Sequence, residues 1–288
     1  MQMTEEFRNL LCRARRPRLA ALTPNGFRIG ALSLILFSFS ASSAGAQTLR
    51  IAAASDLQFA LPDLAAQYEK QSGVKLAISY GSSGNFVAQI QNDAPFDLFL
   101  SADLDYARKL VDAGLAVPDS LQTYAGGRLV LWYPKDSPIN PVDGLLTTLL
   151  DPRVEKISIA NPEHAPYGRA AVAAMRNYGV YEQLKPKLVF GENISQAAQF
   201  VQSGSAQAGL IALSLVLSPA MKGGRWAEIP MPDRSKWLSQ AAVILKSSSN
   251  KPAAASFLTF LKTTEAQNIL KAYGFFVPRL DSTGNANP

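Results

Sequence analysis

The stretch SYGSSGNFVAQI, residues 79–90, joins a strand pattern to a helix pattern. KLAIS (75–79) is a short β-rich run, and FVAQI (86–90) has the apolar spacing of one buried helix face. The turn between them places Ser82 and Ser83 between two glycines. Serine before a helix is a common N-cap, but the free N–H groups and positive dipole end of a helix start can also hold an anion. The pair is therefore a cap, the rim of an anion site or a catalytic pair.

The same junction of strand and helix recurs along the chain. Short β-rich runs lie at 49–54, 75–79, 97–101, 128–133, 156–160, 187–190, 208–213 and 240–245. Between several of these runs, apolar residues recur at helical spacing: Leu57, Leu61, Leu64 and Tyr68; Ile194, Ala198 and Val201; and, in a last helix, Phe257, Leu258, Leu261, Ile269 and Leu270. Strands that alternate with helices predict an α/β fold with largely parallel sheets.

Two stretches rich in proline or glycine interrupt this pattern. They are TYAGG (123–127) and MKGGRWAEIPMPDRSKW (221–237). If the chain crosses at both, one lobe is built from residues 47–127 and 238–288, and a second lobe from residues 128–237. The cleft between two α/β lobes is a usual place for a small ligand, because strand carboxyl ends and helix N-termini converge there.

Residues 1–46 have the features of a secretory signal peptide. Six arginines and two glutamates lie in this segment, and its apolar run, Ile29–Phe39, spans eleven residues. A membrane span needs about 20 apolar residues, so we expect export rather than anchoring by a helix. The segment ends in Ala44-Gly45-Ala46, an A-x-A cleavage pattern. Arg15-Arg16 leaves a twin-arginine signal open as an alternative to general secretion.

Composition excludes several classes of function for the remaining residues. The chain holds 28 basic and 22 acidic residues, and without residues 1–46 these fall to 22 and 20, a net charge of +2. With no basic stripe among aromatic residues, nucleic-acid binding is not expected. The one cysteine, Cys12, lies in the predicted signal, and His164 is the one histidine. The mature chain therefore has no disulfide, no cysteine to carry a lipid and no histidine-rich metal site, which fits an exported protein of the Gram-negative periplasm.

Four helix starts favour an anion site over catalysis. They are Ser55-Asp56, the turn at 81–84, Pro166-Tyr167-Gly168 and the segment 191–195. Each exposes unpaired N–H groups, so two from each lobe that point into one cleft would enclose a small oxyanion with neutral donors. Any one of them is also an ordinary cap.

The catalytic alternative is a secreted serine hydrolase that uses Ser83. A nucleophile elbow requires the pattern G-x-S-x-G, and Asn85 occupies its final glycine position. The one histidine available as a base is His164, in a loop between two prolines. The sequence therefore gives catalysis little support.

Several segments resemble the periplasmic molybdate-binding proteins of ABC transporters. They are AAASDL (52–57), YGSSGNFVAQI (80–90), APFDLFLSAD (94–103), NPEHAPYGRAA (161–171), GENISQAAQFVQSG (191–204) and LKAYGFFVP (270–278). The resemblance runs over essentially the whole of residues 47–288. It implies a two-lobed, type II periplasmic binding fold that closes on a tetrahedral oxyanion, and it supplies the ligand.

The resemblance also implies which residues donate to the oxyanion. Ser55 matches the serine after the first strand, and Ser83 matches the second serine of the pair. The backbone N–H groups of Tyr167 and Ile194 match the two donors of the second lobe. Many family members add a tyrosine hydroxyl at the position of Ala212, so one donor is missing here, and the Tyr167 hydroxyl is a candidate replacement. Molybdenum is held only as its oxyanion through these residues, and no cofactor is implied.

Asp56 and Arg169 do not belong to this set of neutral donors. A carboxylate beside a dianion costs energy, so we expect Asp56 to cap its helix and turn outward. Turned inward, Asp56 would suit a protonated oxyanion such as hydrogen phosphate. Arg169 is expected to lie exposed on the first turn of its helix.

The expected function is transport of molybdate, with tungstate as an equally suitable ligand. Neither ion carries a proton at neutral pH, whereas hydrogen phosphate would press its proton against a donor. Sulfate is smaller and would not reach all donors of both lobes at once. Closure around the ion would create the surface read by a membrane permease, whose cytoplasmic ATPase supplies the work. The chain is expected to act as a monomer without catalysis, and a binder of sulfate or phosphate is the alternative in the same class.

Overall fold

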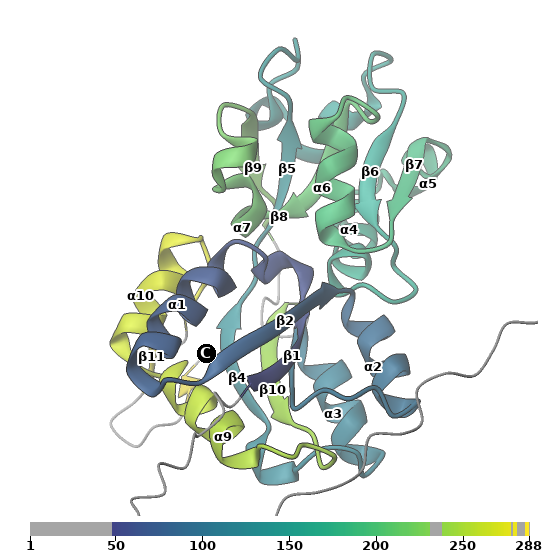
Figure 1. The fold of residues 1–288 in the computed structure, drawn as a ribbon. Coiled ribbons are helices and arrows are strands. Elements are labelled where there is room, and N and C mark those ends of the chain that lie inside the picture. The colour runs from purple at the N-terminus through teal and green to yellow at the C-terminus, as the bar shows by residue number, and fades with distance from the viewer. Residues whose placement is uncertain (1–47, 231–237, 278, 281–285, 288) are drawn as a thin grey trace, which may run out of the picture. The chain divides into compact units, whose positions relative to one another are not determined.

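The computed structural model describes residues 48–230, 238–277, 279–280 and 286–287. Two five-stranded sheets organise them, with the strand orders β2-β1-β3-β10-β4 and β7-β6-β8-β5-β9 (Figure 1). The predicted signal peptide, with Cys12 and Arg15-Arg16, lies outside the described residues. Among the residues described, no helix combines the length and the apolar character needed to cross a membrane.

The first sheet consists of β1 (Thr48–Ala54), β2 (Lys75–Gly81), β3 (Leu98–Ser101), β4 (Gln122–Gly126) and β10 (Ser239–Ile244). Its helices are α1 (Ala60–Ser72), α2 (Ser83–Gln91), α3 (Leu104–Asp112), α9 (Lys251–Phe260) and α10 (Thr264–Ala272). A short 3-10 segment, Ser55–Leu57, follows β1, and another spans Pro118–Ser120. We call these elements the first lobe.

The second sheet consists of β5 (Leu129–Tyr133), β6 (Ile157–Ala160), β7 (Leu188–Gly191), β8 (Ala208–Ala212) and β9 (Arg225–Glu228). Its helices are α4 (Pro166–Asn177), α5 (Tyr181–Leu184), α6 (Ile194–Gln202) and α7 (Leu213–Val216). Short 3-10 segments span Pro141–Asp143, Leu145–Leu150, Lys185–Lys187 and Pro219–Met221. We call these elements the second lobe. Two residue pairs, β11 (Arg279–Leu280) and β12 (Ala286–Asn287), form a separate antiparallel ladder.

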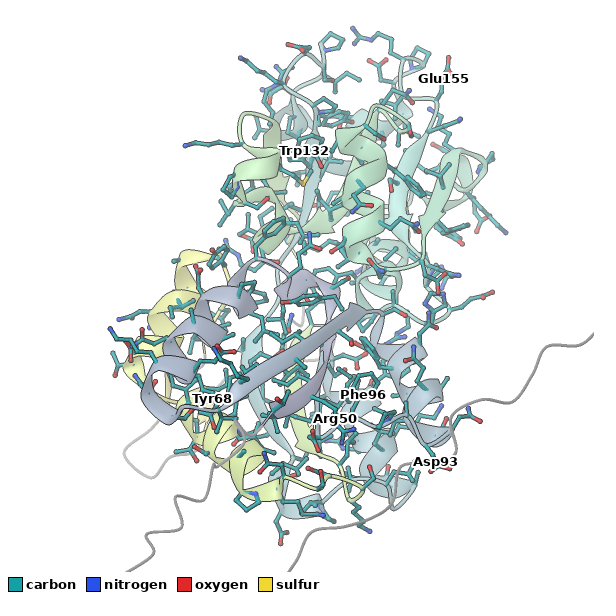
Figure 2. All side chains as sticks on the ribbon, viewed as in Figure 1. Arg50, Tyr68, Asp93, Phe96, Trp132 and Glu155 are labelled. Atoms are coloured by element: carbon teal, nitrogen blue, oxygen red, sulfur yellow. The ribbon has the colours of Figure 1, made fainter. Side chains whose placement is uncertain are left out.

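The first sheet is buried on both faces because its strands alternate apolar side chains between two helical layers. On β3, Leu98 and Leu100 join the core under α1, α9 and α10, whereas Phe99 joins the core under α2 and α3. Tyr68 and Phe96, both labelled in Figure 2, belong to these opposite sides. The second lobe has its own core.

Two strands run against the direction predicted for them. β1 pairs in parallel with β2 and β3, and β6 with β7 and β8. The prediction of largely parallel sheets is nevertheless wrong, since β10 is antiparallel to β3 and β4, and β5 is antiparallel to β8 and β9. The chain reaches β5 and β10 directly from the other lobe, whereas it reaches the parallel strands from a helix of the same lobe. β5 and β10 therefore enter their sheets from the opposite end.

The chain passes between the sheets twice, from β4 to β5 and from β9 to β10. The proposed lobe boundaries, 47–127 with 238–288 and 128–237, fall in these two connections, although residues 231–237 lie outside the described residues. The α/β prediction is confirmed, and each of the eight predicted β-rich runs overlaps a strand. The stretches expected only to cross between lobes also contain β4 and β9.

The predicted last helix is two helices. α9 ends at Phe260 and α10 begins at Thr264. The Thr263 hydroxyl accepts a hydrogen bond from the N–H of Ala266 at 3.3 Å, so threonine caps a new helix in the middle of an apolar pattern that reads as continuous. The apolar spacing was informative, because Phe257 and Leu270 are both fully buried.

Phe257 gives the sharpest test of the first lobe's core. Its ring centroid lies 5.0 Å from that of Tyr68 in an edge-on contact, and its side chain is 0% exposed. Phe257→Ala is expected to lower the free energy of unfolding by about 3–5 kcal/mol, because it leaves a cavity. Phe190→Ala is the control, since Phe190 is 51% exposed, and urea unfolding followed by circular dichroism measures both. Equal effects of the two substitutions would contradict this account of the core.

Candidate functional site

A small pocket lies where the two lobes meet. It is lined by Ala54, Ser55, Asp56, Gly81, Ser82, Ser83, Ala102, Ala165, Pro166, Tyr167 and Ile194. The four residues predicted to bind the oxyanion, Ser55, Ser83, Tyr167 and Ile194, are therefore brought together from four separate segments. Ala212, at the end of β8, does not line this pocket.

Three helices begin at the pocket. α2 starts at Ser83, α4 at Pro166 and α6 at Ile194. The N–H groups in the first turn of a helix have no acceptor within that helix, and the aligned peptide dipoles place partial positive charge at this end. Proline has no N–H to leave unpaired, which makes Pro166 suited to the first position of α4. The first free N–H of α4 is then that of Tyr167.

The two serines predicted as ligands each accept one backbone hydrogen bond. Ser83 Oγ accepts a hydrogen bond from the N–H of Ala102 at 3.0 Å. Ser55 Oγ accepts one from the N–H of Ser195, at 3.4 Å. A hydroxyl has one proton and two lone pairs, so each oxygen keeps its proton for a further partner. Both side chains can therefore donate to an anion in the pocket.

Ser82 has a different role from its neighbour. Its side chain caps α2 by accepting a hydrogen bond from the N–H of Asn85 at 3.4 Å. His164 Nδ1 lies 3.0 Å from the same hydroxyl oxygen. The histidine therefore contacts Ser82 and not Ser83, the serine considered as a nucleophile. Both serines line the pocket, and Ser82 is the one whose side chain caps the helix.

Asp56 turns inward, and the expectation that it caps a helix from the outside is wrong. Its side chain is 0% exposed. Asp56 Oδ2 accepts hydrogen bonds from the Tyr167 hydroxyl, at 3.0 Å, and from the side-chain amide of Gln240. The Ser214 hydroxyl donates to the backbone carbonyl of Asp56 at 2.7 Å. Burial raises the pKa of the Asp56 carboxyl to about 6, although the two side-chain hydrogen bonds act in the opposite direction.

The Tyr167 hydroxyl is committed to this carboxylate and does not replace the donor missing at Ala212. Its proton is donated to Asp56, and burial together with the nearby carboxylate raises the pKa of Tyr167 well above its ordinary value. The hydroxyl fits closely against Gly127 in the connection between the lobes, where a Cβ atom would collide with it. The glycine pair in TYAGG was the sequence signal for this close approach.

A second group of contacts ties the lobes together at the pocket rim. Arg169 forms an ion pair with Asp103, and its guanidinium also donates to the Tyr106 hydroxyl at 3.0 Å and lies 4.7 Å from the centre of that ring. The N–H of Gly84 donates to the backbone oxygen of His164 at 2.9 Å. Arg169 is half-buried, less exposed than expected, and its charge is paired with the other lobe.

The pocket has no arrangement for a bare metal ion. Within the described ranges, no three His, Cys, Asp or Glu side chains gather in a way that could hold one. The groups that face the pocket are hydroxyls, backbone N–H groups and one buried carboxyl. Such a lining suits a small ligand whose outer atoms accept hydrogen bonds.

Two α/β lobes joined by two crossings, with helix starts from both at one pocket, define a solute-binding protein of the periplasmic type. The family model for "Bacterial extracellular solute-binding protein" matches residues 49–276, and the chain belongs to this family. Molybdate-binding protein ModA of Rhodobacter capsulatus is 39% identical over 252 residues, which cover 88% of this chain and 97% of that protein. The ModA protein of Azotobacter vinelandii is 40% identical over 236 residues, covering 82% and 92%.

A solved structure supports the same assignment. The periplasmic molybdate-binding protein of Azotobacter vinelandii has a TM-score of 0.74 and 35% sequence identity to this chain, and the match covers 80% of this chain and 100% of the other. The prediction of a two-lobed, type II periplasmic binding fold is confirmed, as is the resemblance to molybdate-binding proteins.

Arg169 is expected to hold the lobes closed. Arg169→Met removes the charge and leaves Asp103 buried beside Tyr106, so the population of open molecules should rise. Spin labels on Asp119→Cys and Lys222→Cys, one exposed position in each lobe, report the distance between lobes, and no other cysteine follows residue 46.

The matched control is Arg153→Met. Arg153 pairs with Asp151 two residues away, so its loss changes no contact between lobes. A broader, longer distance distribution is expected for Arg169→Met alone. Identical distributions in both variants would show that the rim ion pair does not hold the lobes.

Proposed function

We propose that this chain captures molybdate between its two lobes and delivers it to an ABC importer. One observation carries the proposal: Ser55 and Ser83, whose oxygens each accept a backbone N–H, line one pocket at which three helices begin. A fully ionised oxyanion is the ligand that uses only such donors. The relatives named as molybdate-binding proteins supply the identity of the ion.

Four donors are proposed to bind the ion directly. They are the hydroxyls of Ser55 and Ser83 and the backbone N–H groups of Tyr167 and Ile194. The two serines belong to the first lobe and the two N–H groups to the second, so the ion would bridge the lobes. Binding would then stabilise the closed arrangement, by the difference between the binding free energy of the ion with four donors and that with two.

Selectivity follows from protonation and size. Tungstate meets the same requirements as molybdate and is proposed as an equivalent ligand. Hydrogen phosphate would leave its proton unpaired against the hydroxyl and N–H donors, which is costly in a buried site. The inward Asp56 carboxyl accepts such a proton only while it is ionised, so phosphate is the competing ion that bears on the state of Asp56. Sulfate, the smaller ion, would contact fewer donors. Sulfate and phosphate are the competing ligands that the experiment must include.

The proposed setting is the periplasm, reached with a signal peptide at residues 1–46 and without lipidation. The closed monomer would dock on a membrane permease whose ATPase drives import. The relatives are named for binding and not for catalysis, and we propose no reaction for this chain. His164 contacts Ser82 and not Ser83, so the contacts of the described residues also give the hydrolase alternative no support.

Thermal unfolding of residues 47–288, freed of bound ions, tests the proposal. Molybdate, tungstate, sulfate and phosphate are added separately. An ion at about 100 times its dissociation constant should stabilise the protein by roughly 2.7 kcal/mol, which is a shift of several degrees. Shifts are expected with molybdate and tungstate. A shift with sulfate or phosphate alone would assign another oxyanion, and no shift with any ion would contradict the proposal.

Ser83→Ala is the matched variant for this experiment. Loss of a hydrogen bond to a charged ligand costs about 1.5–3 kcal/mol, so the dissociation constant for molybdate should rise about 10- to 150-fold. Ser203→Ala, at an exposed serine beyond the end of α6, should change nothing. Unchanged molybdate affinity in Ser83→Ala, or turnover of ester substrates that this substitution abolishes, would return attention to the enzyme alternative.

A further inference from the structure

The Asp56 carboxyl has one oxygen with two hydrogen-bond donors and one with none. Oδ2 receives Tyr167 and Gln240. Oδ1 is one of three buried side-chain polar atoms among the described residues that have no hydrogen-bond partner. A buried polar atom is rarely left in this state, so the unpaired Oδ1 requires an explanation.

Asp56 also lines the pocket proposed for a dianion. An ionised Asp56 would place a third negative charge there, in surroundings that screen charge poorly. Arg169, the cation at the rim, is paired with Asp103. The charge of the pocket is therefore favourable for a dianion only if the carboxyl carries a proton.

We propose that Asp56 is a further ligand-binding residue, which must be neutral and which donates the proton on Oδ1 to the bound oxyanion. This inference rests on the proposed function. It supplies a side-chain donor that the other candidates do not, since Ala212 has no hydroxyl and the proton of Tyr167 points at Oδ2. Asp56 is thereby a determinant of specificity, because capture of an unprotonated oxyanion takes up one proton from solution.

The groups that contact Asp56 do not take up a proton near neutral pH, so the proton is assigned to the Asp56 carboxyl. The side chains that contact it are Tyr167 of α4 and Gln240 of β10, and the Tyr124 hydroxyl of β4 donates to Gln240 at 2.7 Å. Burial and the nearby carboxyl raise the pKa of both tyrosines well above the ordinary value, so neither loses a proton near neutral pH. Ser214 of α7, which contacts the Asp56 backbone, does not titrate.

Four further titratable or charged residues lie at the rim, away from this carboxyl: Asp103, His164, Arg169 and Glu192. Their hydrogen bonds and ion pairs in the described part of the chain are made with other groups than Asp56. His164, which contacts Ser82 at the pocket rim, has its own control below.

The direction of the pH dependence follows from the burial of Asp56. In the free protein its pKa is raised to about 6, and a bound dianion raises it further. Below about pH 6 the carboxyl is already protonated, and affinity should not change with pH. Above this value the proton must be taken up on binding, so the dissociation constant should rise about tenfold per pH unit until the pKa of the complex is reached.

Titration calorimetry with sodium molybdate between pH 6 and 8.5 tests this inference on the whole mature chain. Measurements at pH 7.5 in buffers of different ionisation enthalpy give the number of protons taken up per ion. The expected result is close to one proton for the unchanged protein. In Asp56→Asn, whose amide donates without titrating, we expect no uptake and the same affinity at every pH.

Two further results complete the test. His164→Gln should keep the proton uptake of the unchanged protein, and loss of uptake there would assign the proton to the histidine. Molybdate binding without proton uptake in the unchanged protein would overturn the role of Asp56 while leaving the proposed function intact. Absence of molybdate binding at every pH would instead overturn the proposed function. The proton count in the unchanged protein decides the matter even if Asp56→Asn fails to fold.

Discussion

The proposed site depends on one constraint: a buried oxyanion requires donors that hydrogen bonds of the protein hold in place. Ser83 Oγ is fixed by the N–H of Ala102, and Ser55 Oγ by that of Ser195. The contact to Ser83 lies within the first lobe and does not depend on closure, whereas the contact to Ser55 joins the two lobes and forms when they close. The helix starts at Tyr167 and Ile194 add N–H groups that the backbone itself holds in place. Neutral donors achieve this without a buried positive charge.

The two crossings of the chain turn this local chemistry into a closing device. Ser55 and Ser83 belong to the first lobe, whereas Tyr167 and Ile194 belong to the second, so an ion that binds all four also joins the lobes. The Arg169–Asp103 ion pair acts in the same direction at the rim. Because its partners come from different lobes, it stabilises closure and not the fold of either lobe. The pocket and the rim are therefore coupled through the relative position of the two lobes.

Local patterns in the sequence located most elements, but not β4, β9 or the break between α9 and α10, nor the directions of the strands or the side chains between lobes. Apolar spacing located α1, α2 and α6, since the strands and helices depend on neighbours close in sequence. The antiparallel courses of β5 and β10 depend on the crossings, which spacing does not record. The four residues that the family resemblance implies as donors line one pocket, and their role as donors stays a prediction. The buried position of Asp56 depends on Gln240, far along the chain, so its own neighbours favoured an ordinary cap.

The most direct test of the central claim is a crystal structure of residues 47–288 grown with molybdate, with diffraction data collected at the molybdenum absorption edge. One strong anomalous peak is expected in the pocket, with oxyanion oxygens within hydrogen-bond distance, roughly 2.7–3.2 Å, of Ser55 Oγ, Ser83 Oγ and the N–H groups of Tyr167 and Ile194. A peak elsewhere, or a pocket ion that contacts only one lobe, would contradict the account.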